Sequence, residues 1–466
     1  MSLSRRSVLL AGAVTGAGLV ACGKSTDSDP AASSGSVLPS DSRSVATDAY
    51  IYGYPLVLMD ITLQSNTAAV PANRMWAVGP VNPTMNSVVM PNIDTLYATA
   101  WLDVGAEPVV LQVPPMDGDR YWLMQIMDAW TNTTHNPSSV APRVRAGQDP
   151  PYHYVITGPN WSGALPDNLT RLAMPTATAW LIGRIELRGQ ADLATAESMQ
   201  QQVLLAPLSA WLRGERPAPV INPDTTALIA PPQQVARMDG RTFFDRLCTL
   251  MLTNPPARDD APALQRFSKI GIRPGGTVGA ASVADLDAAV AAGQMCIPDY
   301  ADPQARRVNG WGFATNLGTY GTDYSLRALT AWTALGANLP EDAVYPQVTA
   351  DAGEQGAPRS YRLHFPAGHT PAARAFWSLT AYTAERSLVP NPAGIYSVGH
   401  QRPVVPLPDG SLELAIQAAD PGSDVPYGNW LPIPETGTFR LALRLYVPEE
   451  RALDGRWQPP SLIRVG

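Results

Sequence analysis

The residues best suited to chemistry gather between Met90 and Asn132. This stretch opens with Asn92 and Asp94 and closes with an Asp128 to Asn132 segment. Two carboxyl groups held ~5–10 Å apart can cleave a glycosidic bond, because one acts as acid and the other as base or nucleophile. Asp94 and Asp128 are therefore the candidate catalytic residues.

The strands that must position these carboxyl groups hold them apart. Alternating and proline-bounded runs predict three strands, over residues 96–102, 109–113 and 121–132. In a simple meander the first and third run in the same direction, so Asp94 and Asp128 lie roughly 20–30 Å apart at ~3.3 Å per residue. Asp103 is better placed to approach Asp128. Asp94 precedes Thr95 and could equally cap a turn.

Aromatic rings beside amides or carboxylates form a second set of candidates. Trp101, Trp130 and Trp430 each lie within two residues of an Asp or Asn, a combination suited to stacking on a sugar ring while amides orient it. The alternative is that each of these tryptophans packs in a hydrophobic core. The predicted substrate-binding residues are Asn92, Tyr97, Trp130, Asn132, Trp377, Asn429 and Trp430.

The sequence lacks the motifs that mark several other kinds of active site. There is no Gly-x-Ser-x-Gly nucleophile elbow and no phosphate-binding glycine loop. The five histidines do not cluster, and His364 and His369 lack the helical spacing of zinc hydrolases. We therefore predict no metal site, and the cofactor remains unknown.

The composition bounds the class of partner. Only 16% of the 466 residues are charged and the net charge is −7, without a basic cluster that could bind a phosphate backbone. A nucleic acid partner is excluded on this ground. A small-molecule or carbohydrate ligand and self-association both stay open.

The first residues resemble an export signal. Arg5-Arg6 precedes an apolar run over residues 8–21, too short to cross a bilayer as a helix. The run ends in a lipobox-like Leu19-Val20-Ala21-Cys22, which predicts lipidation of Cys22 and anchoring in the cell envelope membrane. The alternative is an ordinary signal peptide with an incidental cysteine. Removing residues 1–21 takes away two basic residues and leaves 31 basic against 40 acidic ones, or −9.

The pattern of elements predicts a β-rich α+β fold with two domains. These are an N-terminal antiparallel β-sheet domain with several helices and a C-terminal jelly-roll-like antiparallel β-sandwich. The expected parts are a twin-arginine lipoprotein signal peptide (1–21), a flexible tether (22–44), the N-terminal domain (45–215), a helical, proline-rich connection (216–320) and the C-terminal domain (321–466).

Helical spacing and caps predict the helices. We expect a helix over 41–66 that is kinked or split at Pro55, and others over 191–212, from Thr242 as N-cap, over 282–292 with Ser282 as cap, and over 323–335. Cys248 and Cys296 either form a disulfide or are two small buried side chains.

Many short motifs in order resemble those of one bacterial family, built from domain of unknown function 1254 followed by domain of unknown function 1214. The motifs cover essentially everything after the tether, and include residues 49–55, 91–97, 128–132, 361–368, 376–380 and 429–432. At residues 395–401 the chain has Ile-Tyr-Ser-Val-Gly-His-Gln where the family resemblance leads us to expect a charged Arg-Tyr-Ser-Ile-Gly-Asp-Arg-like turn. The resemblance implies two β-rich domains and no settled reaction.

Two functions follow from these observations. One is an exported, lipid-anchored hydrolase of a small polar or carbohydrate-like substrate, with Asp94 as acid or base. The other is a non-catalytic surface binding or assembly module whose motifs only hold β-turns together.

Overall fold

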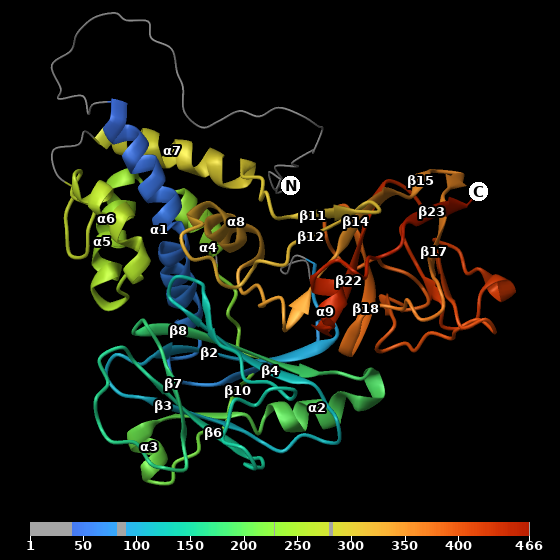
Figure 1. Cartoon of the computed structure of the whole chain (residues 1–466), viewed down its shortest axis with the longest axis horizontal. Coiled ribbons are helices and arrows are strands. Elements are labelled where there is room, and N and C mark those ends of the chain that lie inside the picture. The colour runs from blue at the N-terminus through green and yellow to red at the C-terminus, as the bar shows by residue number, and fades with distance from the viewer. Residues whose placement is uncertain (1–39, 82–89, 228, 279–282, 466) are drawn as a thin grey trace, which may run out of the picture. The chain divides into compact units, whose positions relative to one another are not determined.

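The computed structural model describes residues 40–81, 90–227, 229–278 and 283–465 (Figure 1). The predicted signal peptide, Cys22 and the predicted cap Ser282 lie outside these ranges. Within them the fold is mixed and β-rich, with mostly antiparallel sheets, which confirms the predicted α+β class. No helix in the described ranges combines the length and apolar character that crossing a bilayer requires.

The first sheet contains two of the strands predicted between Met90 and Asn132. Its six strands are ordered β10 (Val220–Ile221), β1 (Trp76–Val78), β2 (Thr95–Asp103), β8 (Thr178–Glu186), β4 (Trp122–Asp128) and β5 (Thr133–His135). β2 and β8 pair along their full length, with Thr95 opposite Glu186 and Asp103 opposite Thr178. This long pairing makes β8 the centre of the sheet.

A second sheet covers one face of the first. It is ordered β7 (Thr170–Ala173), β6 (Tyr152–Thr157), β3 (Val109–Val113) and β9 (Leu204–Pro207). Ala98 and Leu102 of β2 share one apolar cluster with Leu111 of β3 and Ile156 of β6. Because side chains alternate along a strand, the other face of β2 carries Tyr97 and its neighbours toward the rest of the chain.

The predicted meander is wrong, although the direction of its first and third strands is right. β3 leaves for the second sheet, and β8 takes its place between β2 and β4, antiparallel to both. Asp128 is opposite Ala179 near one end of β8, while Thr95 is opposite Glu186 at the other end. At ~3.3 Å per residue the two ends lie roughly 23 Å apart. Asp94 and Asp128 therefore do not form a pair.

Helices gather on the open face of the first sheet and beside it (Figure 1). They are α1 (Ser40–Thr67), α4 (Pro231–Ala236), α5 (Gly240–Thr253), α6 (Ala261–Ser268), α7 (Val283–Asp299) and α8 (Tyr324–Ala334). Tyr50, Tyr52 and Tyr54 of α1 are fully buried among them. α1 continues through Pro55 as one helix, where a kink or a break was predicted.

Two helix predictions are wrong in their details. The predicted helix 191–212 is instead η1 (Gln190–Asp192) and α2 (Leu193–Gln200), then strand β9, then α3 (Leu208–Leu212). The reason is that residues 204–207 pair with β3, and Pro207 has no N–H to give a helix. Helix α5 is capped by Asp239 rather than Thr242, since the Asp239 carboxylate accepts the backbone N–H of Thr242 at 2.8 Å.

The remaining small elements complete these regions. η2 (Arg258–Asp260) precedes α6. Two further short helices, η3 (Gly422–Asp424) and α9 (Glu450–Leu453), lie among the C-terminal strands. Helix α8 ends at Ala334 and Gly336 follows with φ 89°, so the predicted stop at this glycine is confirmed. Cys248 is a buried free thiol, so the disulfide considered between Cys248 and Cys296 does not form.

The C-terminal strands form a second pair of packed sheets. One is ordered β11 (Arg306–Val308), β12 (Trp311–Phe313), β14 (Gln347–Asp351), β22 (Thr438–Pro448), β18 (Ala373–Thr383) and β19 (Ser397–Val398), with β13 (Ala343–Val344) also paired to β22. The other is ordered β21 (Trp430–Leu431), β20 (Leu412–Ile416), β17 (Ser360–Phe365) and β23 (Leu462–Val465). A small hairpin of β15 (Gly353–Glu354) and β16 (Ala357–Pro358) stands beside them.

The two faces of β22 differ sharply in chemistry. Leu441, Leu443 and Leu445 are fully buried in the core between the two C-terminal sheets. The residues between them must point the other way, because side chains alternate along a strand. That opposite face carries Arg440 and Arg444 toward the N-terminal sheet.

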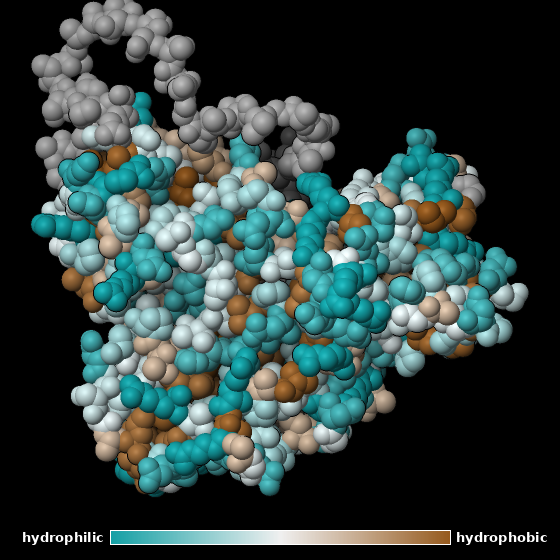
Figure 2. All heavy atoms as spheres, in the orientation of Figure 1, coloured by the Kyte–Doolittle hydropathy of each residue, from teal (hydrophilic) through white to brown (hydrophobic). Residues whose placement is uncertain are grey.

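The outer surface is mostly hydrophilic on the face seen in Figure 2, with hydrophobic side chains in small separate patches. Single exposed hydrophobic residues such as Leu212 and Tyr427 occur on the described surface. Scattered residues of this kind are normal for a protein in water.

Candidate functional site

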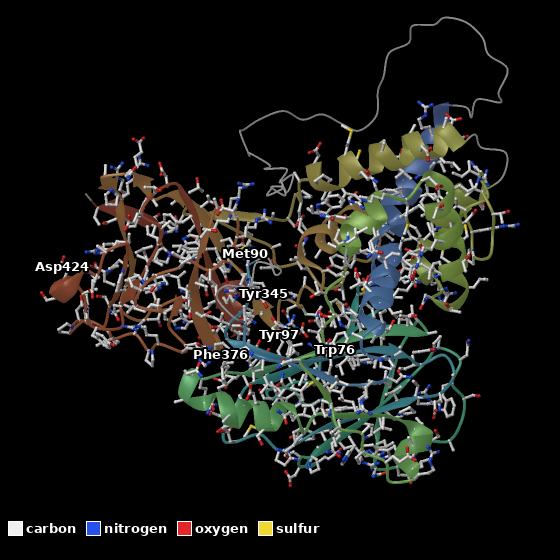
Figure 3. The ribbon with its side chains drawn as sticks, turned by 180° about the vertical axis from the view of Figure 1, so that it is seen from behind. Trp76, Met90, Tyr97, Tyr345, Phe376 and Asp424 are labelled. Atoms are coloured by element: carbon white, nitrogen blue, oxygen red, sulfur yellow. The ribbon has the colours of Figure 1, made fainter. Side chains whose placement is uncertain are left out.

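A cavity of about 460 Å³ lies where the N-terminal sheet, the end of α8 and the strand β22 meet. Figure 3 shows Met90, Tyr97 and Tyr345 close together at this place. Its lining comes from three regions of the chain: Met90, Asn92, Tyr97 and Arg184; residues 333–338; and Tyr345, Gln347, Arg386, Arg440, Ala442 and Arg444. The volume is within the range of small-molecule sites.

Among the described residues, the lining has four arginines and no carboxylate. Arg184, Arg386, Arg440 and Arg444 are the charged residues of the wall. Within the described ranges none of their guanidinium groups lies within 4 Å of a carboxylate oxygen. The whole chain carries a net charge of −7, so this concentration of positive charge is opposite to the average of the molecule.

Arg184 is buried in the wall without an ion pair among the described residues, although its charge acts on Asp342. It is 7% exposed, and it donates to Gln125 Oε1 at 2.6 Å and to the carbonyl of Gly336 at 3.2 Å. Its Nε has no acceptor among the described residues. The guanidinium also lies 5.6 Å from the centroid of the Tyr97 ring. The end of α8 contributes a partial negative charge at Gly336, which offsets only part of a full positive one.

The hydrogen-bond partners of Arg444 are all neutral groups. It is 5% exposed and donates to Tyr382 Oη at 2.5 Å, to Thr380 Oγ1 at 3.0 Å and to the carbonyl of Met90 at 3.2 Å. Burial lowers the pKa of Arg444, but Tyr382, Tyr446 and Asp94 raise it, and the net shift is upward. The group therefore stays charged.

Arg440 and Arg386 complete the charged wall. Arg440 is half-buried and donates to Thr349 Oγ1 at 3.2 Å, while its Nε has no acceptor among the described residues. Arg386 is exposed. Burial lowers the pKa of Arg440, and the positive charge of Arg386 lowers it further. These two arginines lie near one another.

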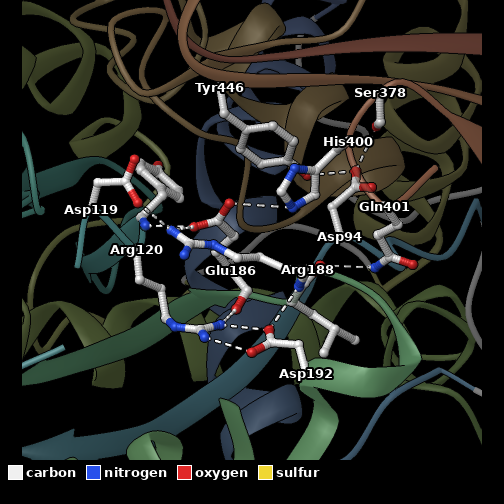
Figure 4. Close-up of polar contacts among 12 residues, drawn as sticks. Asp94, Asp119, Arg120, Glu186, Arg188, Asp192, Ser378, His400, Gln401 and Tyr446 are labelled. Atoms are coloured by element: carbon white, nitrogen blue, oxygen red, sulfur yellow. Dashed lines mark hydrogen bonds and ion pairs between the residues drawn. The ribbon is translucent and has the colours of Figure 1, made fainter. Parts of the chain in front are cut away.

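Asp94 lies beneath the cavity and does not line it. Its carboxylate is fully buried, and Oδ2 accepts the hydroxyls of Ser378 at 2.6 Å and of Tyr446 at 3.2 Å (Figure 4). Tyr446 also reaches Asn92 Oδ1 at 3.1 Å, and Asn92 is part of the wall. Asp94 thus connects β2 to β18 and β22 and supports the wall.

A buried polar network continues from Asp94 along the same seam (Figure 4). His400 Nε2 lies 3.4 Å from Glu186 Oε1, and its ring stacks on Phe376 with centroids 3.8 Å apart. Burial lowers the pKa of His400, although Asp94 and Glu186 oppose this effect. Neutral imidazole is therefore favoured at neutral pH. His400 stands in the segment that departs from the family pattern.

Arg120 shows how a buried arginine is usually compensated in this chain. Its side chain has no exposed surface, and it forms ion pairs with Asp117 and with Asp192, the latter at 2.6 Å (Figure 4). Its Nη1 also donates to the carbonyl of Glu186 at 2.7 Å. Arg184 is almost equally buried and has no such carboxylates, so the contrast lies in the charge of the surroundings.

Neutral hydrogen-bonding groups fill the rest of the wall. Tyr345 donates to Asn338 Oδ1 at 2.7 Å, and Asn92 Nδ2 donates to Tyr97 Oη at 3.1 Å. Burial raises the pKa of Tyr345 to about 12, against the opposing fields of Arg184 and Arg444. The phenol is therefore protonated at neutral pH and can act as a donor or an acceptor to a ligand.

Two of the predicted binding residues line the cavity, and the others lie elsewhere. Asn92 and Tyr97 belong to the wall. Trp130 is buried, and its indole N–H donates to the carbonyls of Asn254 and Pro255. Those two carbonyls hold the ring within the helical core.

The predicted strand over 121–132 ends at Asp128, so Asp128, Trp130 and Asn132 do not share a strand face. The Asp128 carboxylate accepts the backbone N–H groups of Trp130 at 2.9 Å and Asn132 at 2.8 Å, which closes a turn. Thr131 adopts φ 71° inside this turn. Burial raises the pKa of Asp128 to about 6, against these hydrogen bonds. The carboxylate holds a turn here, away from the cavity.

The remaining predicted binding residues belong to the C-terminal sandwich. The Asn429 side chain is fully buried and bonds to the backbone of Val405 and of Glu413. The indole of Trp430 donates to the carbonyl of Gln417 at 2.8 Å. Trp377 is half-buried and packs near Phe365, with ring centroids 6.2 Å apart. None of these three lines the cavity in the described structure.

No group of three or more His, Cys, Asp or Glu side chains in the described ranges is arranged to hold a metal ion. The four arginines of the cavity were missed by sequence reasoning. The signal that could have found two of them is the alternation of Arg440 and Arg444 with Leu441, Leu443 and Leu445 on one strand. Such alternation is also ordinary for a strand with one solvated face, so by itself it marks only which side of β22 leaves the core.

Comparison with known proteins gives a family and a fold. Residues 72–207 match the model described as "Protein of unknown function (DUF1254)", and residues 342–450 match "Protein of unknown function (DUF1214)". No curated protein sequence matches the chain. Asn92, Tyr97 and Arg184 lie in the first matched range, and Arg386, Arg440 and Arg444 lie in the second.

One solved structure shares the fold, and a second matches more weakly. The crystal structure of the VPA0106 protein from Vibrio parahaemolyticus is 23% identical, with a TM-score of 0.66 over 91% of this chain and 100% of that chain. The crystal structure of an uncharacterised protein from Burkholderia cenocepacia is 16% identical, with a TM-score of 0.44 over 91% and 94%. The order of the two matched regions agrees with the resemblance seen in the motifs. The chain therefore belongs to the family that combines an N-terminal domain of unknown function 1254 with a C-terminal domain of unknown function 1214.

Proposed function

We propose that this protein binds a small anionic molecule in the cavity between its two matched domains. The observation that carries the proposal is a wall with four arginines and no carboxylate. A guanidinium group recognises carboxylate or phosphate oxygens through paired, charge-assisted hydrogen bonds. An anion in the cavity would supply the charge that the wall lacks.

The burial of Arg184 supports the same conclusion. A charge removed from water without an ion pair is costly, and residues kept at such a cost are common at functional sites. Arg120 demonstrates that this chain can place carboxylates around a buried arginine. Arg184 instead lines the cavity without forming an ion pair among the described residues.

Binding is favoured over hydrolysis for this cavity. Its described wall offers no carboxylate, imidazole or thiol to act as acid, base or nucleophile. Asp94 is fully buried beneath the wall, with its Oδ2 occupied by Ser378 and Tyr446. A general base must come within hydrogen-bond reach of the proton that it abstracts. The non-catalytic alternative is therefore the one that the contacts support.

Calorimetric titration of the full chain tests this function. We expect citrate, glucuronate and inorganic phosphate to include at least one ligand that binds, while the neutral sugar glucose does not. Affinity should fall as sodium chloride is raised from 20 to 300 mM, because ions screen the charges. Absence of heat for every anion at low salt would contradict the proposal, and equal affinity for glucose would contradict its electrostatic basis.

We also propose that the protein is exported and held in the cell envelope by lipid on Cys22. Support comes from Arg5-Arg6, the short apolar run and the lipobox-like residues 19–22. Replacing Cys22→Ser should move the protein from the membrane fraction to the soluble envelope fraction, measured by immunoblot after fractionation. Arg5→Lys together with Arg6→Lys should instead leave it in the cytoplasm. Membrane association of Cys22→Ser equal to that of the natural chain would rule out the lipid anchor.

A further inference from the structure

The four arginines of the cavity form two separate pairs. Arg184 and Arg444 are 7% and 5% exposed and form the inner pair. Both act on Tyr345, since each opposes the rise of its pKa that burial causes. Arg440 is half-buried and Arg386 is exposed, and they form the outer pair.

The geometry of β22 separates the pairs. Arg440 and Arg444 lie on the same face of this strand, with Ala442 between them also in the wall. Four residues at ~3.3 Å each place their Cα atoms roughly 13 Å apart. Their hydrogen-bond partners differ as well, because Arg440 bonds to Thr349 of β14 while Arg444 bonds to Thr380 and Tyr382 of β18. The two guanidinium groups are therefore held toward different neighbours of β22, that of Arg440 toward β14 and that of Arg444 toward β18.

Each pair contains a donor without an acceptor. The Nε of Arg184 and the Nε of Arg440 are both buried and unpaired among the described residues. Both nitrogens have almost no accessible surface, so a ligand in the cavity would contact the terminal nitrogens of these side chains. Each pair offers such N–H donors to its own acceptor group.

The rest of the described wall is uncharged. It includes Ala334, Ala337 and Ala442 together with the amides of Asn338 and Gln347. Small side chains leave room for the middle of a ligand, and the amides can bond to hydroxyl groups. The central part of the cavity therefore suits a short aliphatic or hydroxylated chain better than a third charge.

We propose that the ligand carries two anionic groups at opposite ends of a short chain. One end binds Arg184 and Arg444, and the other end binds Arg386 and Arg440. This inference rests on the proposed anion-binding function. Either end is a carboxylate or a phosphate, since a guanidinium group binds both in the same way.

Matched ligand pairs test the inference by calorimetry on the full chain at low salt. Hexanoate and adipate differ in one terminal carboxylate, and glucose 6-phosphate and 6-phosphogluconate differ in a carboxylate at the end opposite the phosphate. We expect the second acid group to tighten binding roughly 10- to 100-fold in at least one pair, as one further charge-assisted contact does. The pair that responds identifies the chemistry of the ends.

Variants locate the second group. Arg386→Gln and Arg440→Gln should each remove most of the gain from the second acid group and weaken the single-ended ligand much less. Arg386 is exposed, so its variant should fold even if Arg440→Gln does not. Arg213→Gln is the matched control, because Arg213 is an exposed arginine paired with Glu215 outside the cavity.

The outcomes separate the two proposals. If no anion binds, the anion-binding function itself fails. If single-ended anions bind and the second acid group adds nothing in either pair, only the two-ended ligand is overturned. The two-ended ligand is also overturned if Arg386→Gln and Arg440→Gln weaken single-ended and two-ended ligands equally.

Discussion

Arg184→Met is expected to abolish most anion binding while lowering the stability of the fold only modestly. Losing a charge-assisted hydrogen bond to the ligand should weaken binding by roughly 1.5–3 kcal/mol, or about 10- to 150-fold. Stability should fall by about 1–3 kcal/mol, because Gln125 Oε1 and the carbonyl of Gly336 lose a buried donor, while no ion pair is broken. Calorimetric titration and urea unfolding measure the two effects on the same sample.

Arg120→Met is the matched control for this prediction. Arg120 is also buried, but Asp117 and Asp192 balance its charge. Removing one partner of a buried ion pair leaves the other uncompensated and costs about 3–5 kcal/mol. Arg120→Met should therefore lower the free energy of unfolding and leave the intrinsic anion affinity of the folded protein intact. A similar loss of stability in Arg184→Met would show that Arg184 is structural, against the proposed function.

Asp94→Ala should be among the most destabilising single substitutions in the chain, at roughly 3–5 kcal/mol. The fully buried carboxylate accepts the hydroxyls of Ser378 and Tyr446, and its charge acts on Arg444. Its loss leaves two hydroxyls and a positive charge without their partner. Urea unfolding, followed by tryptophan fluorescence, measures the change in the free energy of unfolding.

Asp94→Asn separates the hydrogen bonds from the charge. The asparagine oxygen can still accept both hydroxyls, but its amide hydrogens meet the buried Oδ1 position, where no described partner exists. We expect a loss of about 1–2 kcal/mol, less than half that of Asp94→Ala. Ser378→Ala, which removes one donor, should cost less still. Full stability of Asp94→Asn combined with lost turnover of some hydrolysed substrate would instead restore Asp94 as a catalytic residue.

The local elements could be predicted from sequence, because they depend on neighbouring residues. The strands beginning at Thr95 and Val109, and the stop of α8 at Gly336, follow from alternation, proline boundaries and glycine. The helix expected over 191–212 was wrong because pairing of residues 204–207 with β3 decides their conformation. Pairing between distant segments overrides local preference.

The candidate site was less predictable for the same physical reason. The direction argument correctly separated Asp94 from Asp128, and it required that any partner for Asp94 come from another part of the chain. Those partners proved to be Ser378 and Tyr446, more than 280 residues away. Nothing in the order of residues reveals which face of β22 meets β2. That contact is what brings Arg184 and Arg444 into the wall of one cavity.

The wall of the cavity joins residues from position 90 to position 444, and this has a thermodynamic consequence for the two domains. A ligand that needs both walls stabilises only the state in which they are docked, by RT ln(1 + [L]/Kd). By the reciprocity of linkage, any event that loosens the docking lowers ligand affinity by the same factor. Ligand binding and docking of the two domains are therefore coupled. A higher ligand concentration favours the docked state, and stronger docking raises the ligand affinity.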